Sequence, residues 1–174
     1  MMNLTTFVNH YPKKLFLLFL AVISLTACKN NAEKNAEDLI ENAYEKETGQ
    51  KMDVNLGEQS TTIKTDMGTT QYSSEIKSWP KDIPSDVPEF AFGKLNGGLT
   101  TDQNDGHGWT LNYINVPKEA VREYEESLKS NGFQTNVVII NDQGGSVMGT
   151  KGKISVTFMG GEEGGVLSVF VGKE

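Results

Sequence analysis

The sequence predicts an α+β fold in which an antiparallel sheet carries one packed helix, preceded by a second helix and a small β-meander. Two kinds of periodicity support this. Apolar residues recur at helical spacing over 32–47 and 117–130, whereas most other segments alternate apolar and polar residues with the period of a strand. Short glycine-rich turns separate the alternating segments, so consecutive strands are expected to pair antiparallel.

The first element is a targeting segment. Lys13 and Lys14 precede an apolar run of 11 residues from Leu15 to Leu25. A membrane-spanning helix needs about 20 apolar residues, whereas a signal-peptide core has about 7–15 behind a basic flank. The run therefore indicates export and not a permanent membrane span.

The run closes with Leu25-Thr26-Ala27-Cys28, which resembles the lipobox of bacterial lipoproteins. The resemblance implies cleavage between Ala27 and Cys28 and a diacylglyceryl group on the Cys28 thiol. Cys28 is the only cysteine of the chain, and lipidation would withdraw it from redox chemistry. The expected location is the extracytoplasmic side of a cell membrane or outer membrane, with residues 28–31 as a lipidated tether. The alternative is an ordinary secretory peptide with an incidental cysteine.

Charge restricts the partners. Residues 1–27 hold two of the 16 Lys and Arg and none of the 23 Asp and Glu, so the chain from Cys28 onward has a formal net charge of 14 − 23 = −9. This balance opposes nucleic-acid binding, which needs a basic footprint. It also offers no polybasic attraction to an anionic membrane, so the expected membrane contact is the lipid on Cys28.

Residues 32–73 are predicted to form a helix and a meander. The helix spans 32–47, with Gly49 as a left-handed stop and an acidic face turned to solvent. Three short strands follow with period 2: one around Val54, one around Ile63, and a third over 69–73.

Residues 74–92 are predicted to be a stiff connecting strap. Trp79-Pro80, Ile83-Pro84 and Val87-Pro88 each place a bulky residue before a proline, and such residues favour extended conformations. We expect three apolar side chains of the strap to be pinned to a core, namely those of Ile83, Val87 and Phe90.

Residues 93–174 are predicted to form a ββαβββ domain. A weak strand over 93–101 precedes a polar loop over 102–108 and a strand over 109–116. Pro117 opens a helix that ends at Asn131-Gly132, with Phe133 packing back on it. A central strand over 133–141, a Gly144-Gly145 turn and two further strands over 153–159 and 166–171 complete the order.

The lipobox, the short helix, the meander and above all the strap WPKDIPSDVPEF at 79–90 together resemble a group of small bacterial envelope lipoproteins of uncharacterised function. At the level of the fold alone, the chain is also similar to lipoprotein subunits with helix-on-sheet domains that serve outer-membrane assembly machines. The resemblance implies an envelope location and brings no catalytic residue with it.

Few residues suggest a catalytic, metal-binding or nucleotide-binding site. His107 is the only histidine after residue 27, and the nearby Asp102 and Asp105 suggest a loose cation contact or, more simply, a polar turn. Counted from Asp102, an EF-hand would need glycine where His107 stands and an acid where Tyr113 stands, so that pattern fails. No nucleophile elbow accompanies a serine, and the glycine doublets match no nucleotide-binding loop.

The sequence therefore predicts no catalytic residue, cofactor or metal. Trp79, His107 and Trp109 are kept as candidate ligand contacts, although both tryptophans would also serve as core anchors. The function expected is a non-enzymatic, lipid-anchored module that binds an envelope protein or another envelope component. One alternative is a small-ligand-binding lipoprotein with a pocket between the 117–130 helix and the sheet. The other is an enzyme that acts on cell-wall material through paired carboxylates or His107.

Overall fold

The computed structural model describes residues 31–141 and 144–173. The chain divides into two compact units, Met1–Ala36 and Glu37–Glu174. Of the first unit only residues 31–36 are described, and they form the start of helix α2. The expected signal peptide, the Ala27–Cys28 cleavage site and the lipid attachment at Cys28 lie outside the described residues.

The described part contains two helices and nine strands. The helices are α2 (Asn31–Thr48) and α3 (Ala120–Ser130), and the strands are β1 (Met52–Leu56), β2 (Ser60–Thr65), β3 (Gly68–Ser73), β4 (Lys94–Gln103), β5 (Gly106–Ile114), β6 (Gln134–Asn141), β7 (Gly144–Lys151), β8 (Ile154–Gly161) and β9 (Gly164–Gly172).

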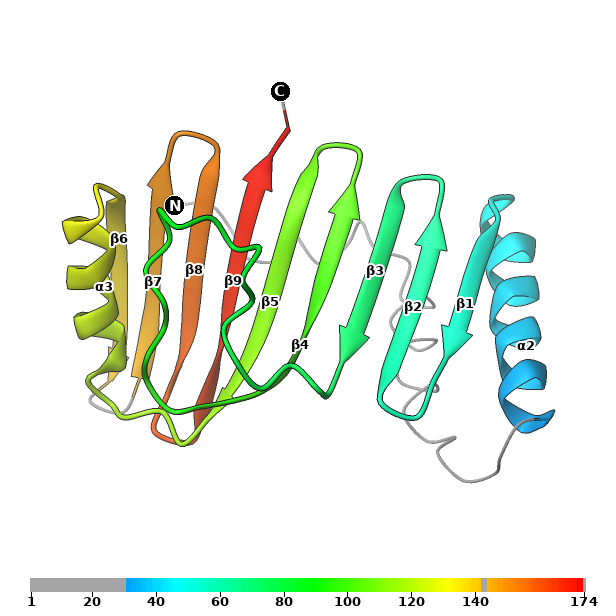
Figure 1. Ribbon diagram of the computed structural model, residues 1–174, viewed down its shortest axis with the longest axis horizontal. Coiled ribbons are helices and arrows are strands. Elements are labelled where there is room, and N and C mark those ends of the chain that lie inside the picture. The colour runs from blue at the N-terminus through cyan, green and yellow to red at the C-terminus, as the bar shows by residue number, and fades with distance from the viewer. Residues whose placement is uncertain (1–30, 142–143, 174) are drawn as a thin grey trace. The chain divides into compact units, whose positions relative to one another are not determined.

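All nine strands form one antiparallel sheet in the order β1-β2-β3-β4-β5-β9-β8-β7-β6. The expected meander and the expected C-terminal module share this sheet because β3 pairs with β4. After β5 the chain crosses through α3 to β6 at the far edge and returns by hairpins until β9 pairs with β5 (Figure 1). The predicted α+β class, with a helix packed on an antiparallel sheet, is confirmed.

Helix α3 follows from local sequence. Pro117 lies just before it and accepts a hydrogen bond from the backbone N–H of Ala120. At the other end, Gly132 has a φ of +82°, and the N–H of Phe133 donates to the carbonyl of Leu128 over 3.0 Å. These contacts form the predicted glycine-containing helix stop. The helix itself begins at Ala120, three residues later than expected.

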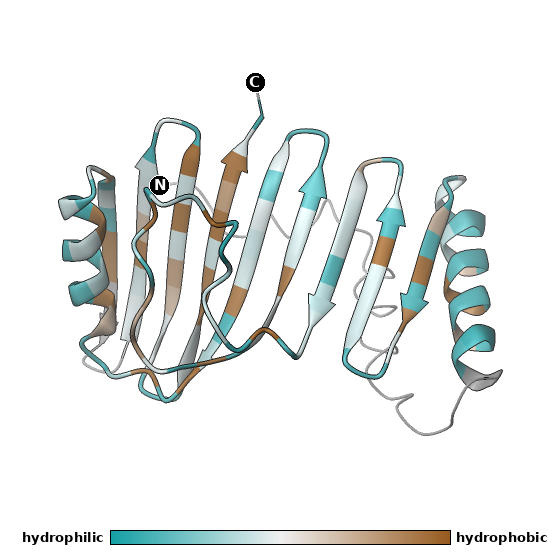
Figure 2. Cartoon of the chain, viewed as in Figure 1, coloured by the Kyte–Doolittle hydropathy of each residue, from teal (hydrophilic) through white to brown (hydrophobic). Residues whose placement is uncertain are grey.

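The strap (residues 74–92) lies across the same face of the sheet as α3 (Figure 1). Ile83, Val87 and Phe90 are buried, as predicted, against the inward side chains of the strands. Phe90 meets the rings of Tyr113, Tyr124 and Phe158 at centroid distances of 4.3–5.0 Å. Figure 2 shows hydrophobic residues along the strap and the C-terminal strands, and also in β1 and β2. The strap and α3 together close one core on one face of the sheet.

Two predictions for the C-terminal strands were wrong. Four strands follow α3, and not three, because Gly144-Gly145 begins strand β7 instead of forming a turn. The strand that was expected to be central, β6, lies at the edge of the sheet. Its continuous apolar run suggested burial on both faces, but Val138 is exposed.

The glycine doublets have a packing role that explains the missed strand. Gly145 pairs with Gly160, and Gly160 also pairs with Gly165, so three glycines lie side by side across β7, β8 and β9. A Cβ on Gly165 would stand 2.6 Å from the ring of Phe158, and one on Gly160 would stand 2.5 Å from the backbone of Gly165. Glycine is therefore required here for close approach and not for a turn.

The polar loop expected over 102–108 is also wrong. Strand β4 extends to Gln103 and β5 begins at Gly106, which leaves only Asn104 and Asp105 as a tight turn. His107 consequently lies in a strand, and Asp102 is its cross-strand neighbour.

At the opposite edge of the sheet, helix α2 satisfies donors of β1. The backbone N–H of Val54 donates to Glu41 Oε1 over 2.8 Å, and that of Leu56 donates to Glu37 Oε1 over 2.6 Å. Four residues of helix rise about 6 Å, which approximates the 6.7 Å or so between N–H groups two apart in a strand. The two carboxylates thus replace the carbonyls of a missing neighbouring strand.

Candidate functional site

Strand β5 brings two of the three predicted contact residues together. His107 and Trp109 are two positions apart and therefore share a face, the one covered by the strap. Their rings meet edge to face at a centroid distance of 4.4 Å. Trp79 belongs to the strap and packs, half-buried, against the core cluster.

Acidic side chains surround this ring pair. Asp82 of the strap accepts a hydrogen bond from Trp109 Nε1 over 3.2 Å, and the same oxygen lies 4.0 Å from His107 Nε2. Asp102 Oδ1 lies 3.9 Å from His107 Nδ1. Because Trp109 is buried, its indole N–H needs a partner within the protein, and Asp82 of the strap provides it. This hydrogen bond fixes the strap to the sheet.

Lys173 sets the electrostatics of Asp102. Its ammonium donates to Asp102 Oδ1 over 3.0 Å and to the carbonyl of Gln103. The hydrogen bond and the positive charge of Lys173 hold the pKa of the Asp102 carboxyl below its ordinary value. Asp102 is therefore paired with Lys173.

The arrangement does not converge on a metal or a nucleophile. The two carboxylates flank opposite nitrogens of His107 at distances beyond hydrogen bonding. Within residues 31–141 and 144–173, no group of three or more His, Cys, Asp or Glu side chains could hold a metal ion. His107 Nε2 is shielded from solvent and has no hydrogen-bond partner in the described part of the chain. We interpret the cluster as an attachment of the strap.

The space between α3 and the sheet is filled. Ala120, Tyr124 and Leu128 of α3 are completely buried against it. The Tyr124 hydroxyl donates to the carbonyl of Pro88 over 3.0 Å, and burial raises the pKa of that phenol. No room remains there for the apolar ligand considered from the sequence.

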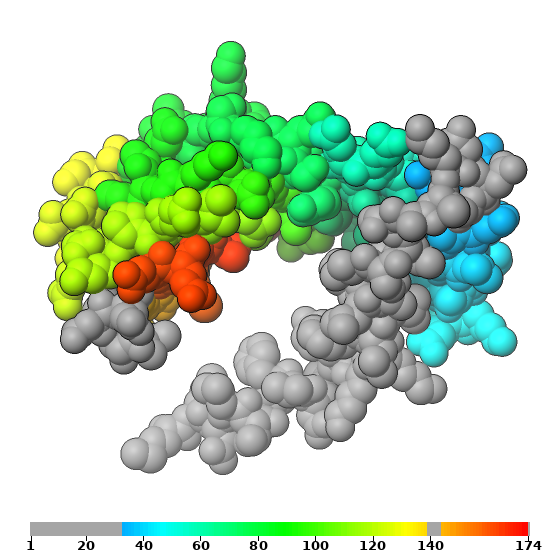
Figure 3. Space-filling view, turned by 90° about the horizontal axis from the view of Figure 1, so that it is seen from below, coloured from blue at the N-terminus to red at the C-terminus, as the bar shows by residue number. Residues whose placement is uncertain are grey.

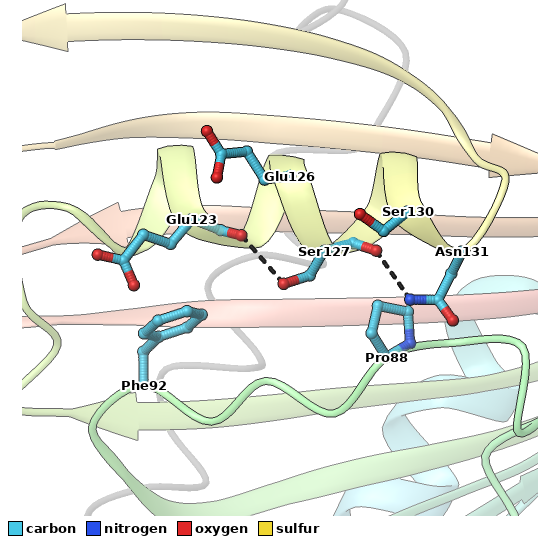
Figure 4. Close-up of a pocket in the computed structure, with 7 residues that line it drawn as sticks. All are labelled: Pro88, Phe92, Glu123, Glu126, Ser127, Ser130 and Asn131. Carbon is cyan, nitrogen blue, oxygen red and sulfur yellow. Dashed lines mark hydrogen bonds between the residues drawn. The ribbon is translucent and has the colours of Figure 1, made fainter.

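A shallow groove of about 620 Å³ lies on the other side of α3, between the helix and the strap (Figure 4). It is lined by Pro88, Phe92, Glu123, Glu126, Ser127, Ser130 and Asn131. Ser127 donates to the carbonyl of Glu123, and the side-chain amide of Asn131 donates to the carbonyl of Ser127. The hydroxyl of Ser127 and the amide of Asn131 thus bond to the helix backbone.

The most distinctive surface is the face of the sheet that the strap and α3 leave uncovered. Five large apolar side chains on four adjacent strands are 36–60% exposed there: Val138 of β6, Met148 of β7, Met159 of β8, and Val166 and Phe170 of β9. We call these five residues the open-face patch. Figure 3 views the sheet from its lower end, with green residues that include the strap along one side and orange-to-red residues of β8 and β9 beneath.

The open face carries almost no charge. Three successive cross-strand rows can be followed through the strand register, two of them from β6 to β1 and the one through Met159 from β6 to β5. The described residues of these rows include no Asp, Glu, Lys, Arg or His. One row runs through Met148, Thr157, Ser168 and Thr110 to Leu99 and Tyr72, and the flanking rows pass through Met159 and Phe170. In a chain with 39 charged Lys, Arg, Asp and Glu residues, this face is a distinct surface.

Sequence reasoning missed the open-face patch. Met148 lies in β7, which was not expected as a strand, so its orientation was not considered. In β9 the alternation was available: Leu167 and Val169 point inward, and Val166 and Phe170 must then point outward. The sequence therefore held one usable signal: in β9 the residues that alternate with the buried ones are apolar as well.

None of the helices in the described part of the chain is long and apolar enough to cross a membrane. The chain matches no protein-family model, no curated protein and no solved structure. The functional argument consequently rests on the site itself.

Proposed function

We propose that this chain is a lipid-anchored protein of the cell envelope that binds a protein partner through the open face of its sheet and catalyses no reaction. The anchor is the diacylated Cys28 on the extracytoplasmic side. The open-face patch carries the proposal, because five exposed apolar side chains lie together on one charge-poor face.

Contiguous exposed apolar surface is uncommon on soluble monomers and marks sites of interaction. The patch also has a composition that suits a protein partner. Two of its members are methionines, whose unbranched and polarisable side chains adapt to a facing surface. The hydroxyls of Thr110, Thr157 and Ser168 lie alongside and can hydrogen-bond to polar atoms of the partner.

The partner-binding part is tested with a photo-reactive amino acid in the full chain. A benzoylphenylalanine in place of Met148 is expected to form a covalent adduct with a protein when cells are irradiated. The matched control places the same probe at Gln71, which is exposed on the other face of the sheet. Equal adduct yields at both positions, or none at either, would count against the proposal.

The anchor is tested separately by the intact mass of the protein purified from membranes. We expect a chain that begins at Cys28 and carries the added mass of a diacylglyceryl group. Cys28→Ala should remove that added mass and release the protein from the membrane fraction. An unmodified wild-type chain would contradict the lipid anchor and leave the binding face unaffected.

A further inference from the structure

We infer that the partner on the open face is a second copy of this chain, packed sheet against sheet; this inference rests on the proposed function and names its partner. Charge is the first observation. From Cys28 onward the chain has a formal net charge of 14 − 23 = −9, so two copies repel each other through most of their surfaces. The three charge-free rows of the open face are where two copies can meet without opposing like charges.

The second argument is self-complementarity. A two-fold axis between β8 and β9, parallel to the strands, places each residue opposite its cross-strand neighbour in the other copy. Met159 then faces Val166, and Thr157 faces Ser168, because these are the register pairs of β8 and β9. Beside the axis one apolar pair and one hydroxyl pair would therefore meet, while Phe170 would lie over Ser155.

The area of the face is the third observation. With the axis between β8 and β9, six strands face each other: β9 lies over β8, β5 over β7, and β4 over β6. At about 4.8 Å spacing, with rows that cover about five residues of each strand, they give roughly 500 Å² on each copy. Two such faces bury roughly 1,000 Å² together, which is the lower end for a specific protein interface, and sheets that pack face to face are a common arrangement.

A lipid surface fits the same face less well. Side chains that settle into a membrane interface are typically Trp, Tyr, Lys and Arg, and the three rows contain only one of these, Tyr72. The hydroxyls of Thr110 and Ser168 lie 3.4 Å apart and can bond to each other, but that of Thr157 would lose water without gaining a partner among acyl chains. A facing sheet supplies that partner.

The test uses two differently tagged full-length chains expressed together, one of which carries benzoylphenylalanine at Met148. Irradiation is expected to give an adduct with twice the chain mass that contains both tags. Thr157→Glu places two like charges on either side of the two-fold axis and should lower the adduct yield at least tenfold. Gln71→Glu, on the other face, should leave the yield unchanged, and thermal unfolding confirms that both variants fold.

An adduct with a different protein would overturn the second copy as the partner while leaving the proposed function in place. The absence of any adduct would overturn both. A twofold-mass adduct whose yield is unaffected by Thr157→Glu would place the contact on some other surface and would also overturn the inference.

Discussion

Single side chains fix the strap to the sheet in this protein. Three polar contacts recur along it: Asp82 with Trp109, Asp86 with Lys151, and the carbonyl of Pro88 with Tyr124. Each joins residues at least 27 positions apart in sequence and thus closes a long loop. Because the apolar side chains of the strap point into the same core, these contacts select one placement for it.

Removal of the Tyr124 hydroxyl tests whether such contacts hold the strap in place. Tyr124→Phe keeps the ring in the core and removes the donor to Pro88, which leaves that carbonyl without this donor. We expect a loss of about 1 kcal/mol in the free energy of unfolding, measured by urea denaturation. Tyr72→Phe, at an exposed tyrosine, is the control and should change stability little. Equal effects of the two variants would contradict the assigned role.

The ion pair of Asp86 makes a prediction about pH. The hydrogen bond and charge of Lys151 hold the pKa of the Asp86 carboxyl below its ordinary value. The pair therefore stabilises the fold above the ordinary aspartate range, about 4, and this contribution is lost as the pH falls through the lowered folded-state pKa. The side chains of Lys151 and Asp86 are 38% and 51% exposed, so water screens the pair and the stabilisation is small.

Lys151→Met should return the Asp86 pKa toward its ordinary value. A carboxyl titration followed by NMR measures this directly. Asp102, which is held low by Lys173, is the internal control and should not move. An unchanged Asp86 pKa in the variant would show that Lys151 is not its partner.

At the scale of elements, helix α2 protects an edge of the sheet. An edge strand presents unpaired N–H groups that invite pairing with other chains. Glu37 and Glu41 occupy two of these donors on β1. The edge is consequently satisfied by a helix, without a further strand.

Removal of one carboxylate should therefore expose one donor. Glu41→Ala is expected to speed hydrogen exchange at the Val54 amide and to leave the amide of Val156, in the interior of the sheet, unchanged. Glu45→Ala on the same helix is the matched control. NMR or mass spectrometry of exchange would give the rates. If Glu45→Ala accelerated Val54 equally, the effect would reflect loss of helix and not of the cap.

The elements that the sequence predicted correctly are those with local signals. The end of α3 is determined by Gly132 and Phe133, which lie next to it, and the strap is marked by its prolines. Strand β7 was missed because Gly144-Gly145 is typical of a turn, whereas its actual cause is the proximity of β8 across the sheet. That proximity depends on the full strand order, which no local pattern contains.

The candidate site shows the same division. His107 and Trp109 were separate candidate ligand contacts, and their edge-to-face contact follows from the unexpected extension of β5 through His107. Asp82 comes from 27 residues before Trp109 and could be placed only by the structure. The open-face patch required both the number of strands and the knowledge of which face the strap covers. The residues of the patch are ordinary in sequence, and only their common exposure distinguishes them.

For the whole molecule, the two faces of the sheet have different roles. The strap and α3 close a dry core on one face, which accounts for stability. The other face is left with exposed apolar side chains and few charges, which is unfavourable in water unless a partner covers it. The proposed anchor at Cys28 would hold the protein at the membrane surface and raise its local concentration for such a contact.

Methionine oxidation on intact membranes is the most direct test of whether the open face is occupied. Met148, Met159 and Met67 are 51%, 60% and 61% exposed in the single chain, and Met67 lies in the turn between β2 and β3, away from the patch. With dilute peroxide and mass spectrometry of the peptides, we expect Met67 to oxidise readily while Met148 and Met159 are protected. Oxidation of all three methionines at the same rate would mean that the face is bare and would contradict the proposed binding surface.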